Sequence, residues 1–122
     1  MSFSASYNPA MNAVETNFRG IVNQQEIQAA MLYSHTLAAE RGTAYFLVDL
    51  TDTDIRLSII DIYNLPEAYE RIGRTRPVRI ALLSPSNQNK ECIDFCKLVS
   101  QNRGWNIETF SDSRQARNWL LS

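Results

Sequence analysis

The stretch Ala44-Tyr45-Phe46-Leu47-Val48-Asp49-Leu50, followed by the polar run Thr51-Asp52-Thr53-Asp54, decides the fold of this chain. An almost unbroken apolar run of this length, rich in aromatic and branched residues, is typical of a strand buried on both faces. We expect this central strand to end in the carboxylate of Asp49, with the polar run as a connector. Because ligands and partners usually bind at the carboxyl edge of open α/β sheets, residues 49–58 are the first place to look for a site.

The composition limits the classes of function. A chain of 122 residues fits one domain, predicted to span residues 1–122. Its net charge of −1 gives no electrostatic reason to expect nucleic acid binding. No apolar run approaches the roughly 20 residues of a membrane span, and residues 1–7 lack the pattern of a secretory signal. The only two cysteines, Cys92 and Cys96, provide no disulfide framework, so we expect a cytoplasmic protein without membrane insertion.

A hairpin is predicted at the N-terminus. Residues 3–7 and 14–18 alternate between polar and apolar side chains on either side of Asn8-Pro9. This pattern predicts two antiparallel strands with one face in solvent, closed by Gly20.

A long helix is predicted to connect the hairpin to the central strand. Asn23 and Glu26 have the spacing of a capping box. Gly42, after Arg41, supplies the C-terminal stop. The inner face of this helix comprises Ile27, Ala30, Met31, Ser34, Leu37 and Ala38.

A capped helix is also predicted after the central strand. Ser58 can act as its N-cap, with Asp61 reaching back to the exposed amides. Pro66 is expected to break the segment into a short turn at residues 59–64 and a helix at residues 67–72.

Two further strand–helix pairs complete the predicted chain. We expect a strand at residues 78–83, a loop at residues 84–87 that contains an N-cap, and a helix that ends near Arg103. A strand at residues 105–110 and a final helix capped by Ser111 or Asp112 follow. Apolar residues on the inner faces of these two helices are Cys92, Phe95, Cys96 and Val99, then Ala116, Trp119 and Leu120. The order ββαβαβαβα predicts an α/β fold with packed helices and a mixed, mostly parallel sheet that has an antiparallel edge strand.

The chain resembles a known family in four features. These are Asp49 in the central strand, a Leu-Ser-x-x-Asp-x-Tyr-x-Leu stretch at residues 57–65, an arginine-bearing entry to the strand at residues 76–83, and a C-terminal pattern. That last pattern comprises Gly104, Phe110, Asp112, Ala116, Trp119 and Leu120. Together they resemble the STAS domain, and most of all the small stand-alone bacterial SpoIIAA-like (STAS/SEC14-type) proteins. The resemblance covers nearly the whole chain and implies a STAS-like fold and a non-enzymatic regulatory or protein-binding role.

The resemblance also implies a candidate phosphorylation site. In STAS antagonists, a serine of an Asp-Ser-Ser-Gly motif opens the helix after this strand, and its phosphorylation switches partner binding. Ser58, nine residues after Asp49, occupies the matching position, but its neighbours are Leu57, Ile59 and Ile60. A phosphate there would be stabilised by free amides and by the helix dipole. The alternative is that Ser58 is an N-cap and no more.

Three carboxylates raise the question of a metal-dependent hydrolase. Asp49, Asp52 and Asp54 lie within six residues. A calcium loop that starts at Asp52 would need glycine where Leu57 stands. We therefore expect solvated carboxylates, no metal and no other cofactor, with Asp49 bonded to backbone amides of the following turn.

Other polar residues fit structural roles. Cys92 and Cys96 are four residues apart, a spacing that favours core packing over redox or zinc chemistry. His35 is the only histidine, so a catalytic role for it is not expected. Arg71, Arg74, Arg76 and Arg79 form the densest basic cluster, which we interpret as a solvated loop, with an anionic partner patch as the alternative.

The segment after Ser58 is more apolar than one face of a short helix requires. Its apolar residues are Ile59, Ile60, Ile62, Tyr63 and Leu65. Packing of all of them into the core is the first interpretation. The alternatives are that some are exposed, or that they cover a cavity or a second subunit in a homodimer. The first hypothesis is thus a regulatory or protein-interaction module that binds through residues 49–58 and the following helix. Its candidate contact residues are Asp49, Thr51, Asp52, Ser58, Ile59, Ile62 and Tyr63. The second is a carrier or sensor of a small hydrophobic, lipid-like ligand, in a cavity lined by Ile59, Ile62 and Tyr63.

Overall fold

The computed structural model describes residues 3–73, 77–85 and 87–122. Its elements, in chain order, are β1 (Phe3–Asn8), β2 (Ala13–Val22), α1 (Gln24–Arg41), β3 (Tyr45–Ile55), α2 (Ile59–Tyr63), α3 (Leu65–Arg71), β4 (Arg79–Leu83), α4 (Lys90–Asn102), β5 (Ile107–Phe110) and α5 (Ser113–Leu121). The predicted order of elements is confirmed, with α2 and α3 as the two pieces expected around Pro66.

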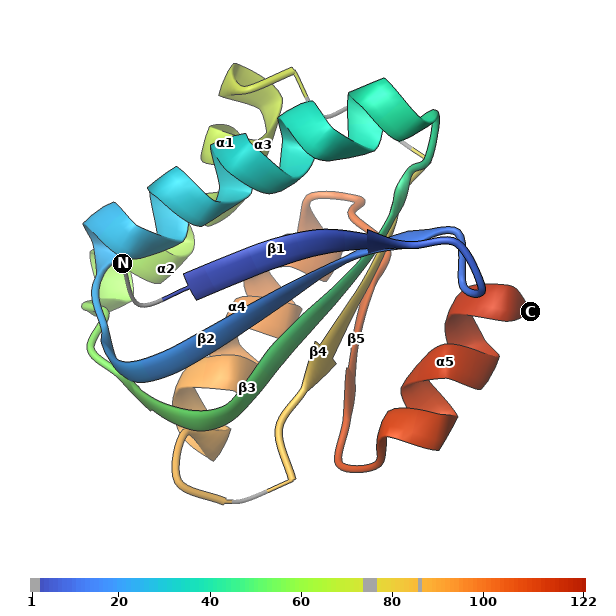
Figure 1. Ribbon diagram of the computed structural model, residues 1–122. Coiled ribbons are helices and arrows are strands. Elements are labelled where there is room, and N and C mark those ends of the chain that lie inside the picture. The colour runs from blue at the N-terminus through green and yellow to red at the C-terminus, as the bar shows by residue number, and fades with distance from the viewer. Residues whose placement is uncertain (1–2, 74–76, 86) are drawn as a thin grey trace.

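The five strands form one sheet in the order β1-β2-β3-β4-β5 (Figure 1). β1 pairs antiparallel with β2, and the remaining neighbours are parallel. β3 lies at the centre, and the antiparallel strand lies at the edge. Both predictions are therefore confirmed. The helices from α1 to α4 cover one face of the sheet, and α5 lies alone on the other (Figure 1).

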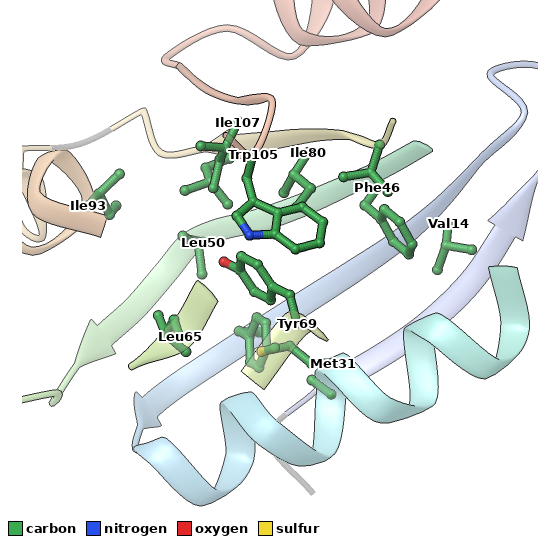
Figure 2. Close-up of a cluster of buried hydrophobic side chains, with 14 of the residues drawn as sticks. Val14, Met31, Phe46, Leu50, Leu65, Tyr69, Ile80, Ile93, Trp105 and Ile107 are labelled. Atoms are coloured by element: carbon green, nitrogen blue, oxygen red, sulfur yellow. The ribbon is translucent and has the colours of Figure 1, made fainter. Parts of the chain in front are cut away.

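The larger core lies between the sheet and α1, α3 and α4. Figure 2 shows Met31, Leu65 and Tyr69 projecting from the helices toward Leu50 of the sheet. The ring of Tyr69 meets that of Trp105 edge to face, with centroids 5.2 Å apart. A smaller core under α5 comprises Met11, Ala13, Leu47, Ala81, Leu83, Ala116 and Leu120. The central strand is thus packed on both faces, as its apolar run predicts.

The helix caps predicted at Asn23, Gly42 and Asp112 are present. The Asn23 side chain accepts from the amide of Glu26, whose carboxylate accepts from the amide of Asn23. Gly42 ends α1 in the left-handed conformation (φ 66°). Asp112 caps α5 through the amide of Arg114. These signals are local in the sequence, which explains why they can be interpreted without the fold.

The prediction that the central strand ends near Asp49 is wrong. β3 continues through the polar run to Ile55, and this extension pairs with the end of β2, where Arg19 faces Asp52. Pairing with β4 stops at Asp49 and Leu83. The last part of β3 therefore has one neighbour and needs no continuous apolar face. A β-bulge between Asn17 and Arg19 shifts the register between β2 and β3, at the point where β3 stops pairing with β4.

Three smaller predictions also differ from the structure. Gly20 does not close the hairpin, because β2 continues to Val22 and Gly20 lies within it at φ 72°. α4 begins at Lys90, later than a cap at residues 84–87 implies, and Ser86 lies outside the described residues. The buried residues of α4 are Ile93, Val99 and Ser100, whereas Cys92, Phe95 and Cys96 are half-buried.

Candidate functional site

α2 presents an apolar surface to solvent. Ile59, Ile60 and Tyr63 are 72%, 70% and 55% exposed, whereas Ile62 is 4% exposed and anchors the helix. A five-residue helix cannot turn so many apolar side chains inward. The interpretation that all of them pack into the core is therefore wrong, and the alternative that some are exposed is confirmed. We call Ile59, Ile60 and Tyr63 the α2 patch.

Ser58 holds the first turn of α2 in a complete capping box. Its Oγ accepts from the amide of Asp61 at 3.1 Å, and its own amide donates to Asp61 Oδ2 at 3.0 Å. Ser58 is exposed. The N-cap interpretation is therefore confirmed, and phosphorylation of the hydroxyl stays a prediction.

Replacing Ser58 by alanine should lower the free energy of unfolding by about 1 kcal/mol, because the Asp61 amide loses its acceptor. Ser58→Asp restores an acceptor at the N-cap and should recover most of that loss. Urea unfolding of the two variants beside the wild-type protein measures the difference. Equal stability of all three proteins would show that the box contributes nothing to folding.

Asp49 is engaged within β3. Its Oδ1 accepts from the amide of Thr51 at 2.9 Å and from the hydroxyl of Thr51. The predicted bond from Asp49 to a following amide is confirmed, but it stabilises a bulged strand and not a turn. Because Leu47 belongs to the core under α5, Asp49, two residues later, lies on that same face of the sheet.

The other two aspartates lie in the β3 extension. Asp54 accepts from Arg56 Nε and Nη2 at 3.1 and 3.0 Å, and both side chains are partly exposed. Asp52 is exposed opposite Arg19. Within the described ranges, no group of three or more His, Cys, Asp or Glu side chains could hold a metal ion.

The candidate residues therefore form two separate groups. Asp49 and Thr51 lie on the face that α5 covers in part, whereas Ser58 and the α2 patch lie on the helix-covered side. Asp49 and Ile55 are about 20 Å apart along the strand, at roughly 3.3 Å per residue. Residues 49–58 therefore run from one face of the sheet to the other, and Asp49 and Ser58 lie on different surfaces.

An apolar cavity of about 90 Å³ lies elsewhere, between the sheet and α1, α3 and α4. Its walls include Phe18, Leu50, Tyr69 and the two cysteines. Ile59, Ile62 and Tyr63, the lining expected from the sequence, do not contribute to it.

Burial controls the chemistry of the two thiols. It raises the pKa of Cys92 above its ordinary value, and it raises the pKa of Cys96 to about 11. Hydrogen bonding to Ser100 and Tyr69 offsets this effect at Cys96 only in part. Both thiols are therefore protonated at neutral pH, in agreement with packing and not with nucleophilic chemistry.

The two described arginines of the basic cluster lie on different elements. Arg71 pairs with Glu67 at 3.1 Å on the exposed side of α3. Arg79 is half-buried against α5, while Arg74 and Arg76 lie outside the described residues. His35, on α1, is half-buried beside Gly73.

Two polar residues with structural importance are not apparent from the sequence. The buried side chain of Asn89 links the start of α4 to Thr53 and Ile55 of β3. Arg79 holds the C-terminal end of α5. The signals available were an asparagine before a helix and an arginine at the start of a strand, and neither identifies partners more than 30 residues away.

None of the helices in residues 3–73, 77–85 and 87–122 combines the length and hydropathy that crossing a membrane requires.

Comparison with known proteins identifies the fold. No protein-family model matches the chain, and no curated protein matches it. A solved structure that does match is an uncharacterised protein of the DUF3478 family with a SpoIIAA-like fold, from Shewanella loihica PV-4. The TM-score is 0.65, and the match covers 98% of this chain and 94% of that chain at 14% sequence identity. The chain therefore has a SpoIIAA-like fold, as its sequence predicts, and at this identity the likeness extends to the fold alone.

Proposed function

We propose that this protein is a non-enzymatic regulatory or protein-interaction module that contacts its partner through α2. The observation that supports this proposal is the α2 patch, in which three large apolar side chains stand exposed on one short helix. Contiguous exposed apolar surface often marks an interaction site. The capping box at Ser58 and the buried anchor Ile62 hold this surface in a fixed orientation, which reduces the entropy lost on binding.

The surroundings of the patch indicate the chemistry of a partner. The guanidinium of Arg103 lies 5.5 Å from the centre of the Tyr63 ring, so a cation borders the apolar surface. A partner with apolar side chains and a carboxylate at the rim would complement both features. Phosphorylation of Ser58 would add negative charge beside Ile59 and would weaken binding of such a partner.

The hydrogen bonds of the aspartate carboxylates support a binding role over a hydrolase activity. Asp49 is bonded to Thr51, Asp54 to Arg56, and Asp61 to Ser58. Each is committed to a neighbour in its own segment, and they do not converge on a point where a substrate could react. The two half-buried free thiols agree with a location in the reducing cytoplasm.

A photo-crosslinking residue at position 60 tests the proposal in the native host. We expect one discrete crosslinked species from position 60 and none from position 32, because Leu32 is comparably exposed but lies on α1. Adding Ile59→Glu should abolish the crosslink, since it places a charge in the apolar contact. Mass spectrometry of the crosslinked species identifies the partner.

The outcomes distinguish the candidate partners. A crosslinked species of twice the protein mass would assign the patch to a homodimer. A crosslinked species that contains a second, different protein would assign it to that partner. Equal labelling from positions 60 and 32, or a crosslink that survives Ile59→Glu, would contradict the proposal.

A second candidate function, as a carrier or sensor of a small hydrophobic ligand, is favoured by the apolar cavity beneath α1, α3 and α4.

A further inference from the structure

The helix-covered core contains more unfilled space than close packing leaves. The cavity measures about 90 Å³ and is walled by Phe18, Val48 and Leu50 from the sheet and by Met31, Tyr69 and Cys96 from the helices. Val48 and Cys96 face this core yet are only half-buried, because the cavity leaves part of their surface uncovered. Protein interiors normally contain few voids larger than a water molecule. This space is several times the roughly 10–15 Å³ that a cavity needs to hold one water molecule.

The walls select an uncharged, apolar occupant. None of the described residues that line the cavity carries a charge. The Ser34 hydroxyl already donates to the carbonyl of Met31 at 3.0 Å, so it offers no free donor. An ion or a strongly polar molecule would lose its hydration without compensation.

The size of the cavity sets an upper limit on the ligand. An apolar cavity of about 150 Å³ takes up benzene or xenon in an engineered protein. The smaller space here fits a compact hydrocarbon up to about one ring, with slight outward movement of the helices. It is too small for an acyl chain. We therefore expect a compact ligand in place of the lipid-like ligand that the sequence suggested.

One end of the cavity lies beside α2. Ile27 in the first turn of α1, Ile55 at the end of β3 and Cys92 in the first turn of α4 are lining residues that keep partial exposure. All three lie at the end of the sheet where β2 and β3 stop (Figure 1). Leu57 and Leu65, which flank α2 in the sequence, also line the cavity. The partly exposed end of the cavity, beside α2, is therefore the entrance that its lining residues indicate.

We propose that this cavity binds one compact, uncharged hydrocarbon-like molecule, which enters beside α2. The inference rests on the second candidate function above and specifies its site and ligand class. It also connects that site to the α2 patch, because the same two leucines that border α2 contact the occupant.

Benzene is the probe for the test. In methyl NMR spectra of the wild-type protein, we expect benzene to shift the signals of Met31, Leu50 and Leu65 and to leave that of the exposed Leu121 unchanged. The melting temperature should rise with benzene concentration, since the ligand binds the folded state. Ala30→Leu fills the cavity from α1 and should remove most of both effects. Ala29→Leu, on the exposed side of the same helix, should preserve them.

Two further measurements keep the test decisive. If Ala30→Leu does not fold, Cys92→Leu narrows the half-buried end of the cavity and should slow or weaken benzene binding. Decanol is titrated in parallel. Shifts with benzene alone support the inference. Shifts with decanol alone would overturn the size limit but leave a ligand-carrier function standing, and no shift with either compound would overturn both.

Discussion

Replacing Asn89 by alanine should lower the free energy of unfolding by about 3 kcal/mol, because buried polar groups lose their partners. The Asn89 side chain is 6% exposed. Its Nδ2 donates to the carbonyl of Thr53 at 2.9 Å and to Thr53 Oγ1 at 3.1 Å, and its Oδ1 accepts from the amide of Ile55 at 3.1 Å. This amide group therefore supplies the bonds that a neighbouring strand would supply, at the point where β3 extends beyond β4. Chemical denaturation with a two-state fit measures the loss.

Two variants separate the hydrogen bonds from the volume of the side chain. Asn89→Asp keeps the shape and the acceptor for Ile55 but removes the donor to Thr53, so at neutral pH we expect a loss similar to that of alanine. Asn87→Ala, at an exposed position in the loop before α4, should change stability by less than about 0.5 kcal/mol. An Asn89→Ala protein as stable as Asn87→Ala would show that water replaces all three bonds.

Local patterns made most of the fold predictable. The capping boxes at Ser58 and Asn23 each connect residues three positions apart, so the sequence alone shows both partners. The apolar runs of β3 and β4 indicate strands packed on both faces, and the alternation of strands with helices determines the parallel order. The excess of apolar residues in α2 raised exposure as an alternative to core packing, and the structure contains an exposed patch.

The remaining features depend on contacts between distant residues. The length of β3 follows from the length of β2 and from Asn89, so a polar run that resembles a loop is held as a strand. The cavity results from how side chains of three helices fill space against the sheet, which no spacing rule describes. Which of residues 49–58 lie on which face of the sheet depends on where β3 ends, and the sequence does not show that end. The sequence therefore indicated which segment to study, but not that Asp49 and Ser58 lie on different faces of the sheet.

The second large effect is expected at Arg79, whose replacement by methionine should cost about 2–3 kcal/mol, as for hydrogen bonds to a charged group. Arg79 Nη1 donates to the carbonyl of Trp119 at 2.8 Å and to that of Ser122 at 2.6 Å. The guanidinium also lies within 6 Å of the ring centres of Tyr45 and Trp119, at 5.7 and 5.8 Å. A cation that bonds the last carbonyls of a helix stabilises its C-terminal end. Hydrogen exchange should therefore accelerate in α5 more than in α1.

Matched variants distinguish this role from a general effect of charge. Arg71→Met removes an arginine whose exposed pair with Glu67 contributes little, so we expect a loss below about 0.5 kcal/mol. Arg79→Lys keeps the charge but not the planar contact with two rings, and its stability should lie between those of the wild-type protein and Arg79→Met. Leu120 and Ala116 of α5 pack against the sheet in the smaller core, so loosening this helix also exposes that core. If Arg79→Met and Arg71→Met were equally stable, α5 would be held by that core alone, and the contacts of Arg79 would contribute no more than the exposed pair of Arg71 with Glu67.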